Sequence, residues 1–258
     1  MISFQHARFA YEPYPIGAAA NFIAPEVYEK CLDAWPAPAL FKFMTGHGNR
    51  YSLSELNNPE AYHDFVASHE VWRAFHKLVK SEEFIGQVLA MLREHHIDLG
   101  IQSWRVAAGA ADWRSDWKER ARETLREFRT CAMRPARLNA RFEFAMKPAQ
   151  GGCIVPHTDM PSKIATLVIA VVRPGEWDSN FGGATEVVRP KDSAQNYNHL
   201  NRYLDFEEVE TLNEFAFEPN QCVIFVKTFN SWHTVRPMRA TSGDMMRKTL
   251  TINIERWE

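Results

Sequence analysis

The chain has 258 residues, of which 45% are hydrophobic and 24% are charged, a balance typical of a globular protein large enough to bury a core. Its 30 lysines and arginines face 32 aspartates and glutamates, so a net charge of -2 provides no basic field for a phosphate backbone and excludes nucleic acid as an expected partner. The N-terminal stretch MISFQHARFAYEPYP carries charges where a signal peptide needs an apolar core, and no apolar run reaches membrane-spanning length. We therefore expect no membrane partner.

The cysteines show neither a close pair nor the dense framework that staples small secreted domains. Reduced thiols and a cytoplasmic location are the simplest expectation. The four residues are Cys31, Cys131, Cys153 and Cys222.

The first half of the chain is predicted to be helical. Residues 24–35 repeat apolar side chains at helical spacing, and residues 58–100 are expected to form two or three further helices. Within that second segment Ser81 suits a helix start and Gly100 a helix stop. Residues 115–130 place an apolar stripe opposite charged pairs, which predicts an amphipathic helix with a solvated face.

From about Leu138 the apolar period changes to two, which predicts strands. Many short strands punctuated by turn residues favour a sandwich, barrel or jelly roll. Residues 190–213 form a long polar insertion, which we expect to be a lid or binding loop. The expected strands are residues 138–146, 163–172, 184–189, 214–219, 221–227 and 248–255.

A histidine and a carboxylate stand two residues apart just before an apolar, β-branched run. In a strand, His157 and Asp159 would point to the same face and could hold one metal ion, although the pair could also belong to a simple turn. A metal would need a further donor from a distant strand, and His233 follows another apolar strand. Two histidines and one carboxylate form the facial triad of non-haem Fe(II) sites, whereas a lone strand-end histidine more often bonds solvent or backbone.

The last expected strand has one apolar and one polar face. Its polar face carries Arg247 and Thr249, and a guanidinium can grip both oxygens of a carboxylate. Arg236 and Lys248 are rival anchors, but Lys248 points to the opposite face.

The segments HTD, FGGATEVV, FNSWHTVRPM and RKTLTINI, in this order, resemble the Fe(II)/2-oxoglutarate-dependent dioxygenases, particularly the branch related to prolyl hydroxylases. The similarity covers roughly Leu138 to Glu255. It implies an α+β fold, a double-stranded β-helix (jelly roll) with N-terminal helices packed on its major sheet. Residues 1–258 would form a single catalytic domain, helical over about 1–137 and a jelly roll over about 138–258, with an inserted loop at about 190–213.

The resemblance further implies Fe(II) held by His157, Asp159 and His233, and 2-oxoglutarate chelating that iron with its far carboxylate on Arg247. O₂ would be the other cosubstrate, and 2-oxoglutarate would be decarboxylated to succinate and CO₂ as a substrate carbon is oxidised. Asp159 favours hydroxylation, because related halogenases carry a small residue at that position. A tyrosine that often helps to hold the cosubstrate in the family is missing. Candidate replacements with a hydroxyl group are Thr166 and Thr249.

Asn139, Arg141 and Glu143 share one face of the strand that precedes the first ligands. If they point into the cleft, the substrate is a polar small molecule such as an amino acid, a peptide or a sugar-bearing metabolite. They could instead meet solvent or pair with each other. The alternatives are a protein side-chain hydroxylase, or a non-oxygenase jelly roll such as a zinc hydrolase or binding module, which would need no arginine facing the cavity. The sequence leaves the oligomeric state open.

Overall fold

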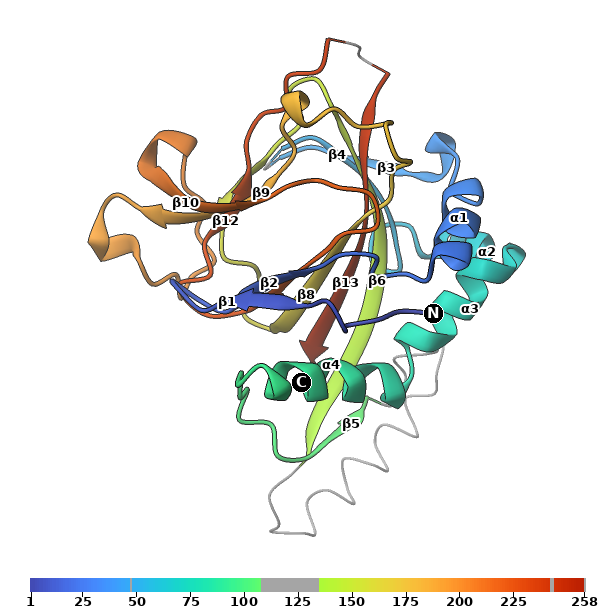
Figure 1. The fold of residues 1–258 in the computed structure, drawn as a ribbon, viewed down its shortest axis with the longest axis horizontal. Helices are drawn as coiled ribbons and strands as arrows, with labels where there is room; N and C mark the ends of the chain where they lie inside the picture. The colour runs from blue at the N-terminus through green and yellow to red at the C-terminus, as the bar shows by residue number, and fades with distance from the viewer. Residues whose placement is uncertain (47, 108–134, 242–243, 258) are drawn as a thin grey trace.

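The computed structural model describes residues 1–46, 48–107, 135–241 and 244–257 (Figure 1). The helix expected at 115–130 and Cys131 lie outside the described residues. The described cysteines Cys31, Cys153 and Cys222 are free thiols. Among the residues described, no helix is long and apolar enough to cross a membrane.

The described residues contain four α-helices, three of them in the segment 58–100, as the sequence predicts. Proline stands at the start of α1 and of α2, where its missing N–H costs no helical hydrogen bond. In Figure 1, α1, α2 and α3 stack along one side of the molecule and α4 lies below them. The helices are α1 (Pro25–Asp33), α2 (Pro59–Ser68), α3 (Glu70–Val79) and α4 (Glu82–Glu94).

Helix α4 begins at the predicted cap. The hydroxyl of Ser81 accepts a hydrogen bond from the backbone N–H of Phe84 at 3.1 Å. We expect Ser81→Ala to lower the free energy of unfolding by about 1 kcal/mol, since this N–H would lose its partner. Urea denaturation measures the change, with Ser179→Ala, at an exposed serine, as the matched control. Equal stability of the two variants would contradict this role for the cap.

The end of α4 differs from the prediction at Gly100. The helix ends at Glu94, because His96 takes the left-handed conformation with φ of 56°. The N–H of Ile97 then donates to the carbonyl of Leu92 at 2.8 Å, a closure that usually employs glycine. Histidine is not a residue that signals the end of a helix in a sequence, so the predicted end at Gly100 lies beyond the observed end at Glu94.

Two sheets account for the thirteen strands of the described residues. The nine-stranded major sheet has the order β1-β2-β11-β8-β13-β6-β4-β3, with β5 parallel to β6, and the minor sheet has the order β10-β9-β12-β7. The major-sheet strands are β1 (Arg8–Ala10), β2 (Ile16–Ala19), β3 (Lys42–Met44), β4 (Arg50–Ser54), β5 (Trp104–Val106), β6 (Ala136–Pro148), β8 (Lys163–Ala170), β11 (Cys222–Val226) and β13 (Met246–Arg256). The minor-sheet strands are β7 (Ile154–His157), β9 (Thr185–Pro190), β10 (Val209–Phe215) and β12 (His233–Val235).

Five strands, β1 to β5, lie in the N-terminal part that was expected to be helical. They are three to five residues long, too short for a period of two to be distinguished from chance. The strand expected at 214–219 also starts earlier, because β10 begins at Val209. The insertion between β9 and β10 therefore covers residues 191–208.

The outer face of the major sheet packs on the helices. Phe142 and Phe144 of β6 meet Trp72 and Phe75 of α3, with 4.7 Å between the ring centroids of Trp72 and Phe144. The apolar face of β13 enters the same core. Because side chains alternate along a strand, the polar face of β13 must point the other way.

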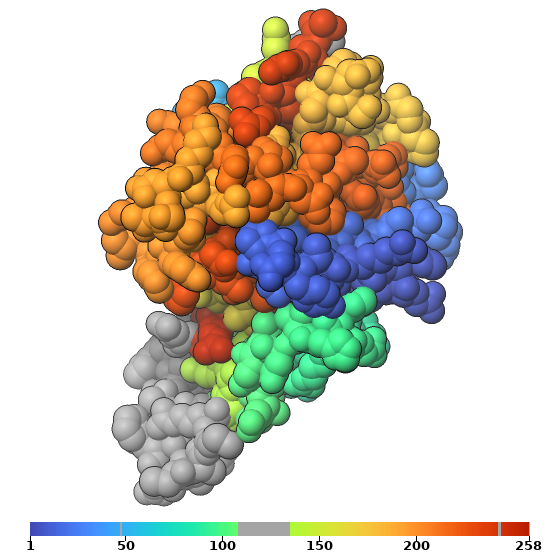
Figure 2. Space-filling model, turned by 60° about the vertical axis from the view of Figure 1, so that its left-hand side comes forward, coloured from blue at the N-terminus to red at the C-terminus, as the bar shows by residue number. Residues whose placement is uncertain are grey.

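The inner face of the major sheet meets the minor sheet through a smaller apolar cluster. Ile16, Val223 and Phe225 of the major sheet pack with Val187 of β9. Figure 2 shows the segment around residues 190–215 on the flank beside the N-terminal segment. The space between the sheets therefore holds both an apolar cluster and the polar faces of β6, β8 and β13.

Candidate metal centre

His157 and His233 are direct partners across the antiparallel pair β7–β12, so backbone pairing sets one imidazole beside the other. Their ring centroids are 4.3 Å apart. Asp159 follows β7 with φ of 65°, a left-handed conformation that aspartate tolerates better than most residues. One ligand atom from each of the three residues lies within 4.8 Å of the others. The structure thus brings together the three side chains singled out in the sequence.

Backbone carbonyls orient both imidazoles. The Nδ1 atoms of His157 and His233 each lie 2.9 Å from a carbonyl oxygen, that of Val155 and that of Ser231 respectively. A carbonyl can only accept, so each Nδ1 carries the proton and each Nε2 keeps a free lone pair. Both rings are therefore held in a tautomer that can bind a metal.

The charge states also suit metal binding. Burial acts to raise the pKa of Asp159, but Lys163 and both imidazoles outweigh it, so its pKa lies well below the usual value. Burial and the neighbouring His157 lower the pKa of His233 to about 3. At neutral pH, Asp159 is a carboxylate and His233 is neutral, which are the forms that coordinate metals.

Two polar side chains fix the carboxylate of Asp159. Lys163 Nζ lies 2.8 Å from Oδ1, and the Thr166 hydroxyl lies 3.2 Å from Oδ2 and 3.2 Å from Oδ1 of Asn253. Thr166, predicted to bind the cosubstrate, is thus placed against a candidate metal ligand. Sequence reasoning missed Lys163, whose spacing of four residues from Asp159 was the available indication.

Aromatic rings enclose the two histidines. Phe225 stacks on His233 with centroids 4.6 Å apart, and Tyr203 of the inserted loop stacks on His157 at 5.8 Å. Tyr14 is buried nearby, and burial together with Asp159 raises its pKa. These rings form apolar walls that limit the access of water to the centre.

Arg247 lies on the inner face of β13, two residues from Thr249, and only 4% of it is exposed. Its Nε donates to the carbonyl of Gly183 at 2.8 Å, and its guanidinium stands 4.3 Å from the ring centroid of Phe217. Burial lowers the pKa of Arg247 to about 9, so it stays charged at neutral pH. Among the described residues, no carboxylate pairs with it.

Gly183 makes the contact with Arg247 possible. Its φ is 88°, and a Cβ atom there would come within 2.9 Å of the Trp177 ring and 3.4 Å of Arg247 Cδ. Glycine alone tolerates both the backbone conformation and the close approach. The turn at Gly182 and Gly183 thus places the Gly183 carbonyl against Arg247.

The rival anchors both have acidic partners. Arg236 Nε donates to Glu186 at 3.0 Å, and Lys248 Nζ donates to Glu176 at 2.9 Å. Of these three cations, Arg247 is the one without a carboxylate partner among the described residues.

The candidate substrate residues on β6 are buried, but they are not equivalent. Arg141 makes two hydrogen bonds to Glu255, of 3.0 and 2.7 Å, so its charge is paired with a residue outside the predicted set. One side-chain oxygen of Asn139 and one of Glu143 are buried without a hydrogen-bond partner among the described residues. Glu143 lies 3.8 Å from the guanidinium of Arg50.

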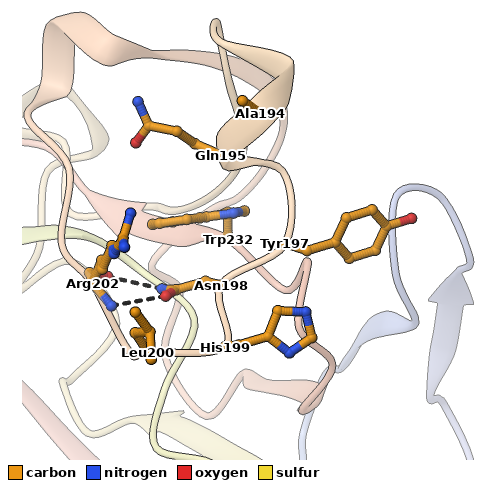
Figure 3. Close-up of a pocket in the computed structure, with 8 residues that line it drawn as sticks. All are labelled: Ala194, Gln195, Tyr197, Asn198, His199, Leu200, Arg202 and Trp232. Atoms are coloured by element: carbon orange, nitrogen blue, oxygen red, sulfur yellow. Dashed lines mark hydrogen bonds between the residues drawn. The ribbon is translucent and has the colours of Figure 1, made fainter.

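The inserted loop packs on the outer side of the minor sheet. Trp232 donates its indole N–H to the carbonyl of Asn196 and packs with Val188, Leu204 and Val209. Trp232 and residues of the inserted loop line a pocket of about 190 Å³. Figure 3 shows the hydrogen bonds that join Asn198 and Arg202 beside Trp232, and the exposed Tyr197, which points away from it. None of the three candidate metal ligands lines this pocket.

No protein-family model matches the chain, and no curated protein matches it. Among solved structures, it is similar to a prolyl-4-hydroxylase of Pseudomonas putida, with 14% identity, a TM-score of 0.48, and coverage of 96% of this chain and 95% of that one. An oxidoreductase of the 2OG-Fe(II) oxygenase family from Burkholderia pseudomallei has 15% identity, a TM-score of 0.42, and coverage of 94% and 84%. HygX from Streptomyces hygroscopicus, with nickel and 2-oxoglutarate bound, has 7% identity, a TM-score of 0.47, and coverage of 93% and 82%.

Proposed function

We propose that the chain is an Fe(II)- and 2-oxoglutarate-dependent oxygenase, a hydroxylase whose single catalytic domain spans residues 1–258. The observation that carries the proposal is the convergence of His157, Asp159 and His233 in their metal-binding forms. The buried guanidinium of Arg247 on the inner face of β13, which has no carboxylate partner among the described residues, supports it independently.

The residues present fit the two groups that this activity requires. One carboxylate and two imidazoles suit Fe(II) and leave coordination positions open. Arg247 is a desolvated cation, and a carboxylate offers it both charge compensation and two parallel hydrogen bonds. A keto acid with a second carboxylate could therefore reach from the metal centre towards Arg247.

We also propose that the strands form a double-stranded β-helix. From β6 onwards, the chain changes sheet at each step except between β9 and β10, with β6, β8, β11 and β13 in the major sheet and β7, β9, β10 and β12 in the minor sheet. Such alternation winds the chain around the space that holds the candidate ligands, and it supports the jelly-roll class.

Fe(II) with 2-oxoglutarate and O₂ would supply the oxidation of a substrate C–H bond, coupled to the release of succinate and CO₂. The chain itself would bind, orient and exclude water. Arg247 and Thr249 would orient the distal carboxylate, and Lys163 and Thr166 would hold Asp159. The aromatic rings of Phe225, Tyr203 and Tyr14 would keep water from the reacting groups.

The proposed substrate is a polar small molecule. Asn139 supports this class, because its buried Oδ1 has no hydrogen-bond donor among the described residues. Glu143 Oε1 instead faces the Arg50 guanidinium at 3.8 Å, and Arg141 is paired with Glu255. A peptide or protein side chain is the alternative, and the inserted loop would then be its docking surface. A succinate-release screen with pooled metabolites against pooled peptides separates the two classes.

The test of the proposed activity is spectroscopic and anaerobic. The protein with Fe(II) and 2-oxoglutarate is expected to show the weak visible charge-transfer band of a keto acid bound through two oxygens, and to release succinate once O₂ is admitted. Protein that binds metal without this band would refute the oxygenase and favour the zinc or binding-module alternative.

A further inference from the structure

We propose that Lys147 is a second cationic anchor for the distal carboxylate of the keto acid, so that the carboxylate lies between Lys147 and Arg247. The inference rests on the proposed function and deepens it, because it makes a charged distal group a requirement of the site. Sequence reasoning did not single out Lys147.

Strand register brings the two cations together. Lys147 on β6 pairs directly with Arg247 on β13, so both side chains leave the same face of the major sheet. On the other side of β6, Tyr51 pairs with Met146, which sets Arg50 of β4 beside Lys147. Three basic side chains thus stand in one row across β4, β6 and β13.

Two of the three cations in this row, Lys147 and Arg247, are buried without a carboxylate partner, whereas Arg50 faces Glu143 at 3.8 Å. Lys147 is 6% exposed and Arg247 4% exposed, and neither has a carboxylate partner within hydrogen-bonding distance among the described residues. The other titratable groups near Lys147 are Arg50, Cys153 and Glu143, and Glu143 lies against Arg50. Two buried like charges repel each other and have lost their hydration. An anion bound between them would offset both the repulsion and the lost hydration energy.

The titration of Lys147 provides a readout that a purely structural lysine would not give. Burial first, and then Arg50 and Arg247, lower the pKa of Lys147 to about 8. A carboxylate beside the amine favours its charged form and raises this pKa. Above pH 8, binding of the keto acid should therefore take up a proton, and the affinity should fall as the pH rises through 8.

The experiment is calorimetric titration of 2-oxoglutarate into the nickel-loaded protein, which does not turn over. Measurements at about pH 7 and about pH 9, in buffers of different ionisation enthalpy, give affinity and proton uptake. Wild type is expected to take up close to one proton at the higher pH. Lys147→Met should lose this uptake and bind about tenfold more weakly at pH 7, the loss typical of a charged hydrogen bond. Lys147→Arg should keep the affinity without the proton uptake.

Two controls isolate the effect. Lys248→Met removes a lysine bonded to Glu176 on the opposite face of β13, and it should change neither quantity. 2-Oxopentanoate, which lacks the distal carboxylate, should bind with an affinity independent of Lys147.

The outcomes distinguish the inference from the proposed function. Wild-type affinity and proton uptake in Lys147→Met, or no proton uptake by wild type above pH 8, would overturn the role of Lys147 alone. Nickel-loaded wild type that does not bind 2-oxoglutarate would overturn the proposed function itself. Should Lys147→Met fail to fold, the wild-type proton uptake and Lys147→Arg still decide the question.

Discussion

Replacement of His157 by alanine is expected to lower the affinity for Fe(II) by more than the roughly 10- to 100-fold that loss of a supporting outer-shell contact costs. The ring supplies one of only three protein donors, and its partner His233 cannot move across the β7–β12 pair to compensate. Without it, Asp159 and His233 would leave the metal with too few ligands. Anaerobic equilibrium dialysis followed by metal analysis measures the affinity.

The matched control for this variant is His199→Ala. His199 is an exposed histidine of the inserted loop that packs on Phe229, outside the metal centre. The His199→Ala variant should bind iron with the affinity of the wild-type protein. Full iron affinity in His157→Ala, in a protein that remains folded, would contradict the assignment of the ligands.

Replacement of Arg247 by methionine is expected to weaken 2-oxoglutarate binding by about a hundredfold, since a bidentate charged contact is lost. Iron binding should stay unchanged, because Arg247 makes no contact with the three ligands. In the absence of 2-oxoglutarate, the variant should be at least as stable as wild type, because an apolar side chain replaces an unpaired buried charge. Anaerobic titration of the visible band and urea denaturation measure these effects.

Arg236→Met is the control for Arg247, since it removes an arginine whose charge is already paired with Glu186. It should bind 2-oxoglutarate like wild type. An equal loss in both variants would mean that general electrostatics, and not a specific anchor, attract the keto acid.

Much of the site could be predicted from the sequence because its constraints are local. His157 and Asp159 are two residues apart, and Arg247 lies on a strand whose alternation reveals its polar face. The rival Lys248 could be rejected on the same alternation. Such patterns need only the geometry of a single strand.

The missed features depend on contacts between distant segments. Lys147 becomes a candidate anchor only because strand pairing sets it beside Arg247. The charge of Arg141 is paired with Glu255, which lies more than a hundred residues later in the chain. The register between two strands cannot be predicted from the residues of either strand alone. Strands as short as β1 and β5 were missed for a related reason, because neighbouring strands, and not their own composition, hold them in the sheet.

The metal ligands and the keto-acid anchor can be seen together in a crystal structure with 2-oxoglutarate and with Mn(II) in place of Fe(II), prepared under anaerobic conditions. We expect one anomalous peak within coordination distance of the Nε2 atoms of His157 and His233 and of an Asp159 oxygen, with the keto acid running from that peak to the Arg247 guanidinium. A metal peak bound by other side chains, or a keto acid whose far carboxylate points away from Arg247, would contradict this expectation.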